Sequence, residues 1–228
     1  MRTKKIKDWA RWNDEMVEKY HSSGTLFESK NPITRNIEIW RLKTIRKLAD
    51  YKEKDVVLDL GCGEGFYLKM VTKPKEIWGI DISKVALKKA RKINKGRRKV
   101  RIMFGNAEDL KNVGGEYFDK ITTSEMLEHV PRPRMVMKEI YRILKKDGVL
   151  VVSVPNEKVI QKIVHFIKLF KLDRFMKAAR KQETYEWHLH ESDLDWLKVQ
   201  IGGLFEIDKV VLIPPLLGYR LVVRLIKK

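Results

Sequence analysis

The chain has 228 residues, of which 43% are hydrophobic and 35% are charged, so it is a globular protein with a sizeable core rather than an intrinsically disordered one. The formal net charge of +19 favours anionic partners such as nucleic acid, an anionic lipid surface or an acidic substrate. The single cysteine excludes an internal disulfide. No apolar run approaches the length that spans a bilayer, so we expect a cytoplasmic protein.

Residues 1–50 are predicted to form a helical cap. Trp9, Trp12 and Met16 recur at spacings of three and four, which places them in one apolar stripe along a helix. A second helical stretch begins after Asn31. The first helix either packs on the body of the protein or acts as a lid over the glycine loop that follows, and the sequence leaves both readings open.

Residues 56–65 read Val-Val-Leu-Asp-Leu-Gly-Cys-Gly-Glu-Gly, and a helical stretch follows from Phe66. The aliphatic part predicts a strand that is buried on both faces. A strand, a glycine turn and a helix together present backbone N–H groups and a positive helix end to a ligand. The third glycine comes one residue earlier than in the dinucleotide-binding fingerprint, so the loop alone is a weak signal.

The second predicted strand, residues 76–82, strengthens this reading because it carries Asp81 near its end, 18 residues beyond Gly63. In this architecture an acid about 20 residues past the glycine loop accepts hydrogen bonds from ribose hydroxyls. The loop and the acid together predict a nucleoside-binding site. The competing reading is a helix N-cap followed by ordinary turn acids.

The rest of the chain continues to alternate between strands and helices. The further strands are predicted at residues 100–104, 117–123, 149–154, 206–213 and 219–226, and the further helices at 84–95, 134–145 and 193–202. This pattern predicts an α/β fold with a doubly wound, mostly parallel seven-stranded sheet, which ends in an antiparallel edge. Ligands should then bind at the carboxyl ends of the strands, at Gly61, Asp81, Asn106, Ser124 and Pro155.

A helical insert is predicted at residues 157–190, after the fifth strand. Apolar residues such as Ile163 and Phe166 lie on one face of its first helix, and lysines cover the rest. Basic amphipathic helices lie on membranes, in partner grooves or on their own domain. No low-complexity linker divides the chain, so we expect one domain over residues 1–228.

With these strand ends identified, the chain resembles the class I S-adenosylmethionine-dependent methyltransferases over residues 31–213. The segments that carry the resemblance are 58–65, Asp81, 106–110, 124–131 and 144–148. The run Glu-Met-Leu-Glu-His-Val-Pro and the insert are similar to the ubiquinone-type O-methyltransferase branch. The resemblance implies a Rossmann-like methyltransferase fold, S-adenosyl-L-methionine as cofactor, and a hydroxyl on a small or lipid-like molecule as acceptor.

The resemblance also implies roles for individual residues. The cofactor-binding positions that it implies are Arg35, Asp59, Gly61, Cys62, Gly63, Asp81, Ile82, Asn106, Ala107, Glu108 and Ser124. The glycine loop would surround the methionine part, Asp81 would hold the ribose hydroxyls, and Ile82 would pack on the adenine. Asn106 stands where the family often has an acid, and its carbonyl oxygen can still accept a hydrogen bond from the adenine amino group. Ser124 would line the cofactor on the substrate side.

Methyl transfer to a hydroxyl needs an aligned nucleophile, exclusion of water and removal of a proton. His129, just beyond the fourth strand, is the candidate base because an imidazole titrates near neutrality; a packing or surface histidine is the alternative. Glu125 and Glu128 beside His129 lack the two-histidine spacing of a helical metal site, so no metal is expected. His188 and His190 would share a face in an extended segment and could form a metal pair, but we favour a substrate-pocket or structural role for them.

Three functions remain open from the sequence: an enzyme that methylates a small or lipid-like molecule, an RNA methyltransferase that uses the basic surface, and a cofactor-binding module without catalysis. Methylation of pyrimidine C5 needs a cysteine near the fourth or fifth strand, whereas the only cysteine is Cys62. The Asn/Asp-Pro-Pro-aromatic turn typical of base amino methylation is also absent after the fourth strand. We therefore favour the first function. The sequence leaves open whether the insert contacts an anionic membrane or packs on its own domain.

Overall fold

The computed structural model of the chain describes residues 8–21, 31–169 and 187–228. Its strands are β1 Val56–Leu60, β2 Glu76–Asp81, β3 Val100–Phe104, β4 Phe118–Ser124, β5 Leu144–Pro155, β6 Phe205–Ile213 and β7 Arg220–Lys227. Its helices are α1 Trp9–His21, α2 Pro32–Ala49, α3 Phe66–Met70, α4 Lys84–Ile93, the 3₁₀ helix η2 Leu127–His129, α5 Pro133–Ile143, α6 Glu157–Leu169 and α7 Leu194–Ile201.

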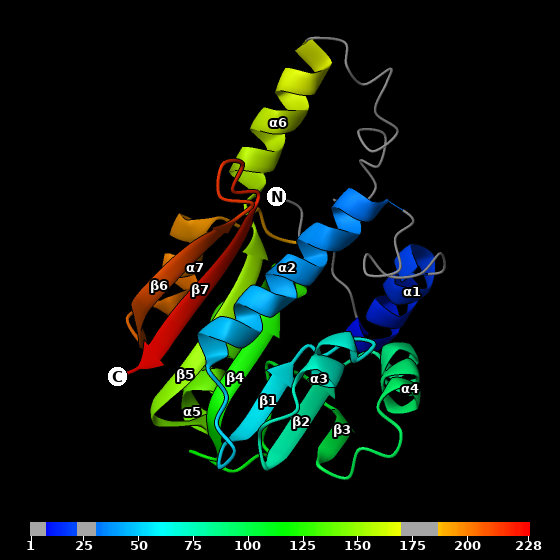
Figure 1. Cartoon of the computed structure of the whole chain (residues 1–228), viewed down its shortest axis with the longest axis vertical. Helices are drawn as coiled ribbons and strands as arrows, with labels where there is room; N and C mark the ends of the chain where they lie inside the picture. The colour runs from blue at the N-terminus through cyan, green and yellow to red at the C-terminus, as the bar shows by residue number, and fades with distance from the viewer. Residues whose placement is uncertain (1–7, 22–30, 170–186) are drawn as a thin grey trace.

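The seven strands form one sheet in the order β3-β2-β1-β4-β5-β7-β6 (Figure 1). Strands β1 to β5 are parallel to one another, whereas β7 is antiparallel to both β5 and β6. The sheet is therefore mixed, and the predicted antiparallel edge consists of β7 inserted between β5 and β6. The chain order reverses between β1 and β4, which is the point where ligands bind in open α/β sheets.

Helices cover both faces of the sheet. Alternate residues of β1 belong to two separate hydrophobic clusters because successive side chains of a strand point to opposite faces. Leu42 and Ile45 of α2 pack in the cluster on one face, and Met137 and Ile140 of α5 pack in the cluster on the other. This double cover explains why all five residues of β1 are buried.

Local signals fix several boundaries. Asn31 caps α2 by accepting a hydrogen bond from the Ile33 N–H at 2.9 Å, and Asp193 caps α7 through the Trp196 N–H at 2.7 Å. The helix predicted to reach residue 145 ends earlier, at Ile143. Leu144 pairs with Phe118 in the sheet and is fully buried, so strand pairing overrides the helical preference of the lysines that follow.

The predicted insert after the fifth strand is described only in part. α6 extends from the sheet as the long helix at the top of Figure 1, and residues 170–186 lie outside the described residues. Within the described part of the chain, no helix combines the length and the apolar character that crossing a membrane requires.

Candidate functional site

The glycine loop after β1 is a tight left-handed turn bound to the end of β2. Gly61 has φ of +77° and Gly63 has φ of +50°, which side chains with a Cβ rarely adopt. A Cβ on Gly61 would lie 2.5 Å from the Cγ of Met126, so this position also requires glycine for space. The backbone N–H of Gly61 donates to the Ile80 carbonyl at 2.8 Å, and that of Cys62 donates to the same oxygen at 3.1 Å.

Asp81 lies directly against this loop, as the sequence predicts. Its Oδ2 accepts a hydrogen bond from the Gly63 N–H and its Oδ1 accepts one from the Ser83 N–H, both at 2.8 Å. Burial raises the pKa of the Asp81 carboxyl, and these two N–H donors oppose the rise. Each carboxylate oxygen has a further lone pair, which leaves acceptor capacity for the hydroxyls of a ribose.

Asp59 lies beneath the glycine loop and is only 4% exposed. Its Oδ1 accepts a hydrogen bond from the Thr122 hydroxyl at 3.1 Å. Burial raises the pKa of Asp59 to about 7; the nearby Asp81 carboxylate adds to the rise, and Thr122 and the charge of Arg41 oppose it. The loop therefore rests on a carboxyl group that titrates near neutrality.

The loop after β3 carries the residues predicted to meet the adenine. Asn106 accepts a hydrogen bond from the Glu108 N–H at 2.9 Å, which forms a turn with Ala107 at its centre. The buried Glu108 carboxylate accepts two hydrogen bonds from Arg132, from its backbone N–H at 2.7 Å and from Nε at 2.8 Å. Glu108 thus joins this loop to the turn before α5, and a direct contact of its side chain with the cofactor stays a prediction.

Arg41, which the sequence analysis did not single out, reaches the ends of β4 and β5. It is 4% exposed, and it donates to the hydroxyl of Ser124 and, at 3.3 Å, to that of Ser153. Arg35, the predicted arginine, is exposed near the start of the same helix. The sequence does contain a signal for Arg41. It lies four residues before Ile45 and next to Leu42, so helical periodicity places it on the buried face of α2.

Arg41 belongs to a largely buried ionic network at the carboxyl ends of β4 and β5. Its guanidinium binds Glu38 at 2.7 Å, and Arg220 of β7 pairs with Glu125 at 3.0 Å between Nε and Oε2. The Ser153 hydroxyl donates to Glu125 at 2.7 Å. Burial opposes ionisation of Glu125, but Arg220 and Arg41 outweigh it and hold its pKa below the ordinary value. Glu125 also has φ of +52°, so the turn after β4 is held in a strained conformation.

Glu128, His129 and His188 come together beside this network. His129 Nδ1 lies 3.0 Å from the Trp187 carbonyl oxygen, and because that oxygen can only accept, Nδ1 carries a hydrogen. The Glu128 carboxyl is fully buried, and neither oxygen has a hydrogen-bond partner among the described residues. Burial and the charge of Glu125 raise the pKa of Glu128 well above its usual range.

One ligand atom from each of Glu128, His129 and His188 lies within 4.8 Å of the others, so this cluster could hold a divalent cation. His188 Nδ1 contacts the Glu157 carboxylate at 2.5 Å, which orients the ring. The sequence suggests two other groupings, Glu125 with Glu128 and His129, and His188 with His190. Glu125 binds Arg220 instead, and His190 contacts the Val130 carbonyl at 2.9 Å.

A mixed α/β sheet with a glycine loop at its switch point and an acid at the end of the adjacent strand defines a nucleoside-binding protein of the doubly wound class. A family model described as a methyltransferase domain matches residues 51–200 of the chain. The chain therefore belongs to the methyltransferase domain family, within the class I S-adenosylmethionine-dependent methyltransferases. The predicted resemblance and the cofactor, S-adenosyl-L-methionine, are confirmed.

Curated relatives indicate the branch. The ubiquinone biosynthesis O-methyltransferase of Alkalilimnicola ehrlichii is 35% identical over 103 residues, which are 44% of this chain and 41% of that protein. The demethylmenaquinone methyltransferase of Staphylococcus haemolyticus is 28% identical over 209 residues, or 85% of this chain and 86% of that protein. The match thus spans less than half of the ubiquinone-type relative and most of the menaquinone-type one.

The same fold occurs in the N-methyltransferase NodS of Bradyrhizobium japonicum, a structure solved with S-adenosyl-L-homocysteine. The two chains superimpose with a TM-score of 0.69 at 15% identity, over 96% of this chain and 99% of NodS. At this identity the comparison establishes the fold alone. It confirms the Rossmann-like fold that the resemblance implies.

Proposed function

We propose that the protein transfers the methyl group of S-adenosyl-L-methionine to a hydroxyl of a small or lipid-like acceptor. The observation that carries the proposal is the contact between the glycine loop and Asp81, in which the Gly63 N–H lies 2.8 Å from Oδ2. This contact supports the proposal because it joins the loop at the switch point of the sheet to a carboxylate with acceptor capacity left for a ribose. His129 lies in the 3₁₀ helix that follows β4, the strand next to β1 in the sheet.

Each part of the cofactor has a counterpart in this arrangement. Asp81 accepts the ribose hydroxyls, while Ile82, Asn106 and Ala107 border the adenine. Cys62 and the glycines surround the methionine part, and Asp59 beneath them supplies a negative charge once it is ionised. Arg35 at the start of α2 faces solvent and is proposed to meet the cofactor carboxylate. The cofactor supplies a methyl group already activated for in-line displacement.

The protein must also remove the proton of the acceptor hydroxyl. Because the Trp187 carbonyl holds His129 with its hydrogen on Nδ1, Nε2 is the nitrogen that accepts this proton. His129 would hold this proton until the product leaves. The bound cofactor would supply the methyl group, and the electron pair of the broken S–CH3 bond would remain on the sulfur of S-adenosyl-L-homocysteine. Ser124, fixed by Arg41, lines the cofactor on the acceptor side.

Apolar surface at the carboxyl end of the sheet supports a lipid-like acceptor. Phe166 and Leu169 of α6 and Leu216 of the β6–β7 loop are exposed large apolar side chains. The start of α6 lies against that loop, since the Asn156 side chain donates to the Gly218 carbonyl at 3.0 Å. Exposed apolar groups beside lysines fit a surface that rests on anionic lipid.

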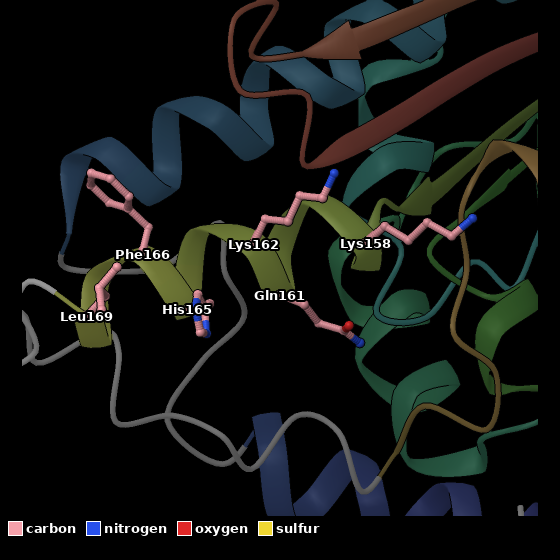
Figure 2. Close-up of a pocket in the computed structure, with 6 residues that line it drawn as sticks. All are labelled: Lys158, Gln161, Lys162, His165, Phe166 and Leu169. Atoms are coloured by element: carbon pink, nitrogen blue, oxygen red, sulfur yellow. The ribbon is translucent and has the colours of Figure 1, made fainter.

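Figure 2 shows six side chains of α6 that border a hollow of about 490 Å³. Gln161 and His165 point to one side of the helix, and Lys162 and Phe166 point to the other. Because all the described lining comes from one helix, this hollow is not the nucleoside site, which lies at β1 and β2. We propose that α6 contacts the membrane in which a lipid-like acceptor resides.

The decisive experiment is methyl transfer from labelled cofactor to quinol acceptors with short and long isoprenoid tails. The proposal expects label on a ring hydroxyl, and Asp81→Ala to lose most cofactor affinity in calorimetry. Unaltered binding by Asp81→Ala would contradict the ribose assignment. Nanomolar, steeply salt-dependent binding of RNA, together with no labelled quinol, would replace this function with the RNA alternative.

A further inference from the structure

Helix α1 lies outside the matched region, residues 51–200, yet it makes a specific polar contact with the nucleoside site. Oδ1 of Asp14 accepts a hydrogen bond from the Ser83 hydroxyl at 2.6 Å and a second from the Val85 N–H at 3.2 Å. Ser83 caps α4, so Asp14 places a carboxylate from a different helix at the positive end of α4. Figure 1 shows α1 beside α4.

Ser83 connects Asp14 to the proposed ribose acid. Its backbone N–H donates to Asp81 Oδ1 at 2.8 Å, while its hydroxyl donates to Asp14 and accepts from the Ala86 N–H at 3.1 Å. Ser83 is 2% exposed, so water cannot replace these partners freely. Ser83 therefore contacts both α1 and Asp81, so the position of α1 and the orientation of the Asp81 carboxylate depend on the same residue.

We propose that Asp14 is a positioning residue for the cofactor, which acts through Ser83 to orient Asp81 and makes α1 the outer wall of the nucleoside site. The proposal rests on the proposed role of Asp81. Besides this contact, α1 buries Val17 and half-buries Trp9, Trp12 and Met16. Docking of α1 and binding of the nucleoside are then coupled, and the coupling is reciprocal: each favours the other.

The test measures the binding of S-adenosyl-L-homocysteine to the full chain by calorimetry. Asp14→Ala is expected to weaken binding by roughly tenfold, within the range of coupling between linked sites. Asp14→Asn keeps a carbonyl oxygen that can accept both hydrogen bonds, so it should recover part of the affinity. Glu18→Ala is the matched control, because it removes the same charge from an exposed position of α1.

Amide hydrogen exchange of α1 distinguishes positioning from a purely structural role. In the wild type, added S-adenosyl-L-homocysteine should slow exchange in α1, and in Asp14→Ala this slowing should disappear while the exchange of β1 and β5 stays unchanged. Should Asp14→Ala fail to fold, Asp14→Asn and the exchange of the wild type decide the matter. No ligand-dependent protection of α1 in the wild type would overturn the inference.

The outcomes also separate this inference from the proposed function. If Asp81→Ala loses binding but Asp14→Ala binds like the wild type, the role of Asp14 is wrong and the nucleoside site stands. If Asp81→Ala binds normally, the nucleoside site itself is wrong. If Asp14→Ala and Glu18→Ala lose the same amount of affinity for S-adenosyl-L-homocysteine, the effect comes from the net charge of α1. That result would also overturn the inference.

Discussion

Replacing Asp59 by asparagine is expected to remove a decrease in folding stability that the cofactor-free protein undergoes as the pH rises. Burial raises the pKa of this carboxyl from 3.8 to about 7. At 1.36 kcal/mol per pKa unit, the rise corresponds to about 4 kcal/mol between the two protonation states. Because the folded pKa is raised, protonated Asp59 stabilises the fold at low pH, and this contribution is lost as the pH rises from about 4 through 7.

Asparagine keeps the oxygen that accepts the Thr122 hydroxyl but cannot ionise. Its amide hydrogens carry a burial cost that does not depend on pH, so that cost cancels when one variant is compared at two pH values. The stability of Asp59→Asn relative to wild type should therefore increase by about 2–3 kcal/mol between pH 5 and pH 8.

The assay is urea unfolding of both proteins, without cofactor, at half-unit steps from pH 5 to pH 8. Wild type at each pH is the reference, so titration of all other groups is shared and drops out. A stability difference that stays constant over this range would refute the reasoning, since it would mean that Asp59 is ionised throughout or is not desolvated.

Three further predictions follow from the site. His129→Ala should lower turnover far more than cofactor affinity. Chelators should leave the turnover of the wild type unchanged. Activity that is lost in chelator and restored by Mg²⁺ would instead give His129 a metal-binding role. Arg41→Leu should cost about 3 kcal/mol in urea unfolding because Glu38 stays buried without its nearest partner, whereas the exposed Arg35→Leu should cost almost nothing. Phe166→Ser should weaken co-sedimentation with anionic vesicles, and unchanged sedimentation would end the proposed membrane contact of α6.

The sequence by itself determined the elements whose chemistry is local. The run from Val56 to Gly65 encodes a doubly buried strand and a left-handed loop, and the predicted proximity of Asp81 to this loop is confirmed by its hydrogen bond with Gly63. The caps Asn31 and Asp193 are equally local, because a side chain two or three residues away satisfies the first N–H groups of a helix. Such features depend on backbone dihedral angles and residue spacing within a short window.

Only the tertiary structure decided which distant side chains meet. Arg41 reaches Ser124 and Ser153 across 83 and 112 residues, whereas the family resemblance implies a role for Arg35 on the same helix. The grouping of Glu128 with His188 and the contact of Asp14 with Ser83 across 69 residues depend equally on how α1, α2 and the last strands pack on the sheet. Strand and helix periodicity specifies which face of an element is buried, but the partner on that face is set by the packing of the whole chain.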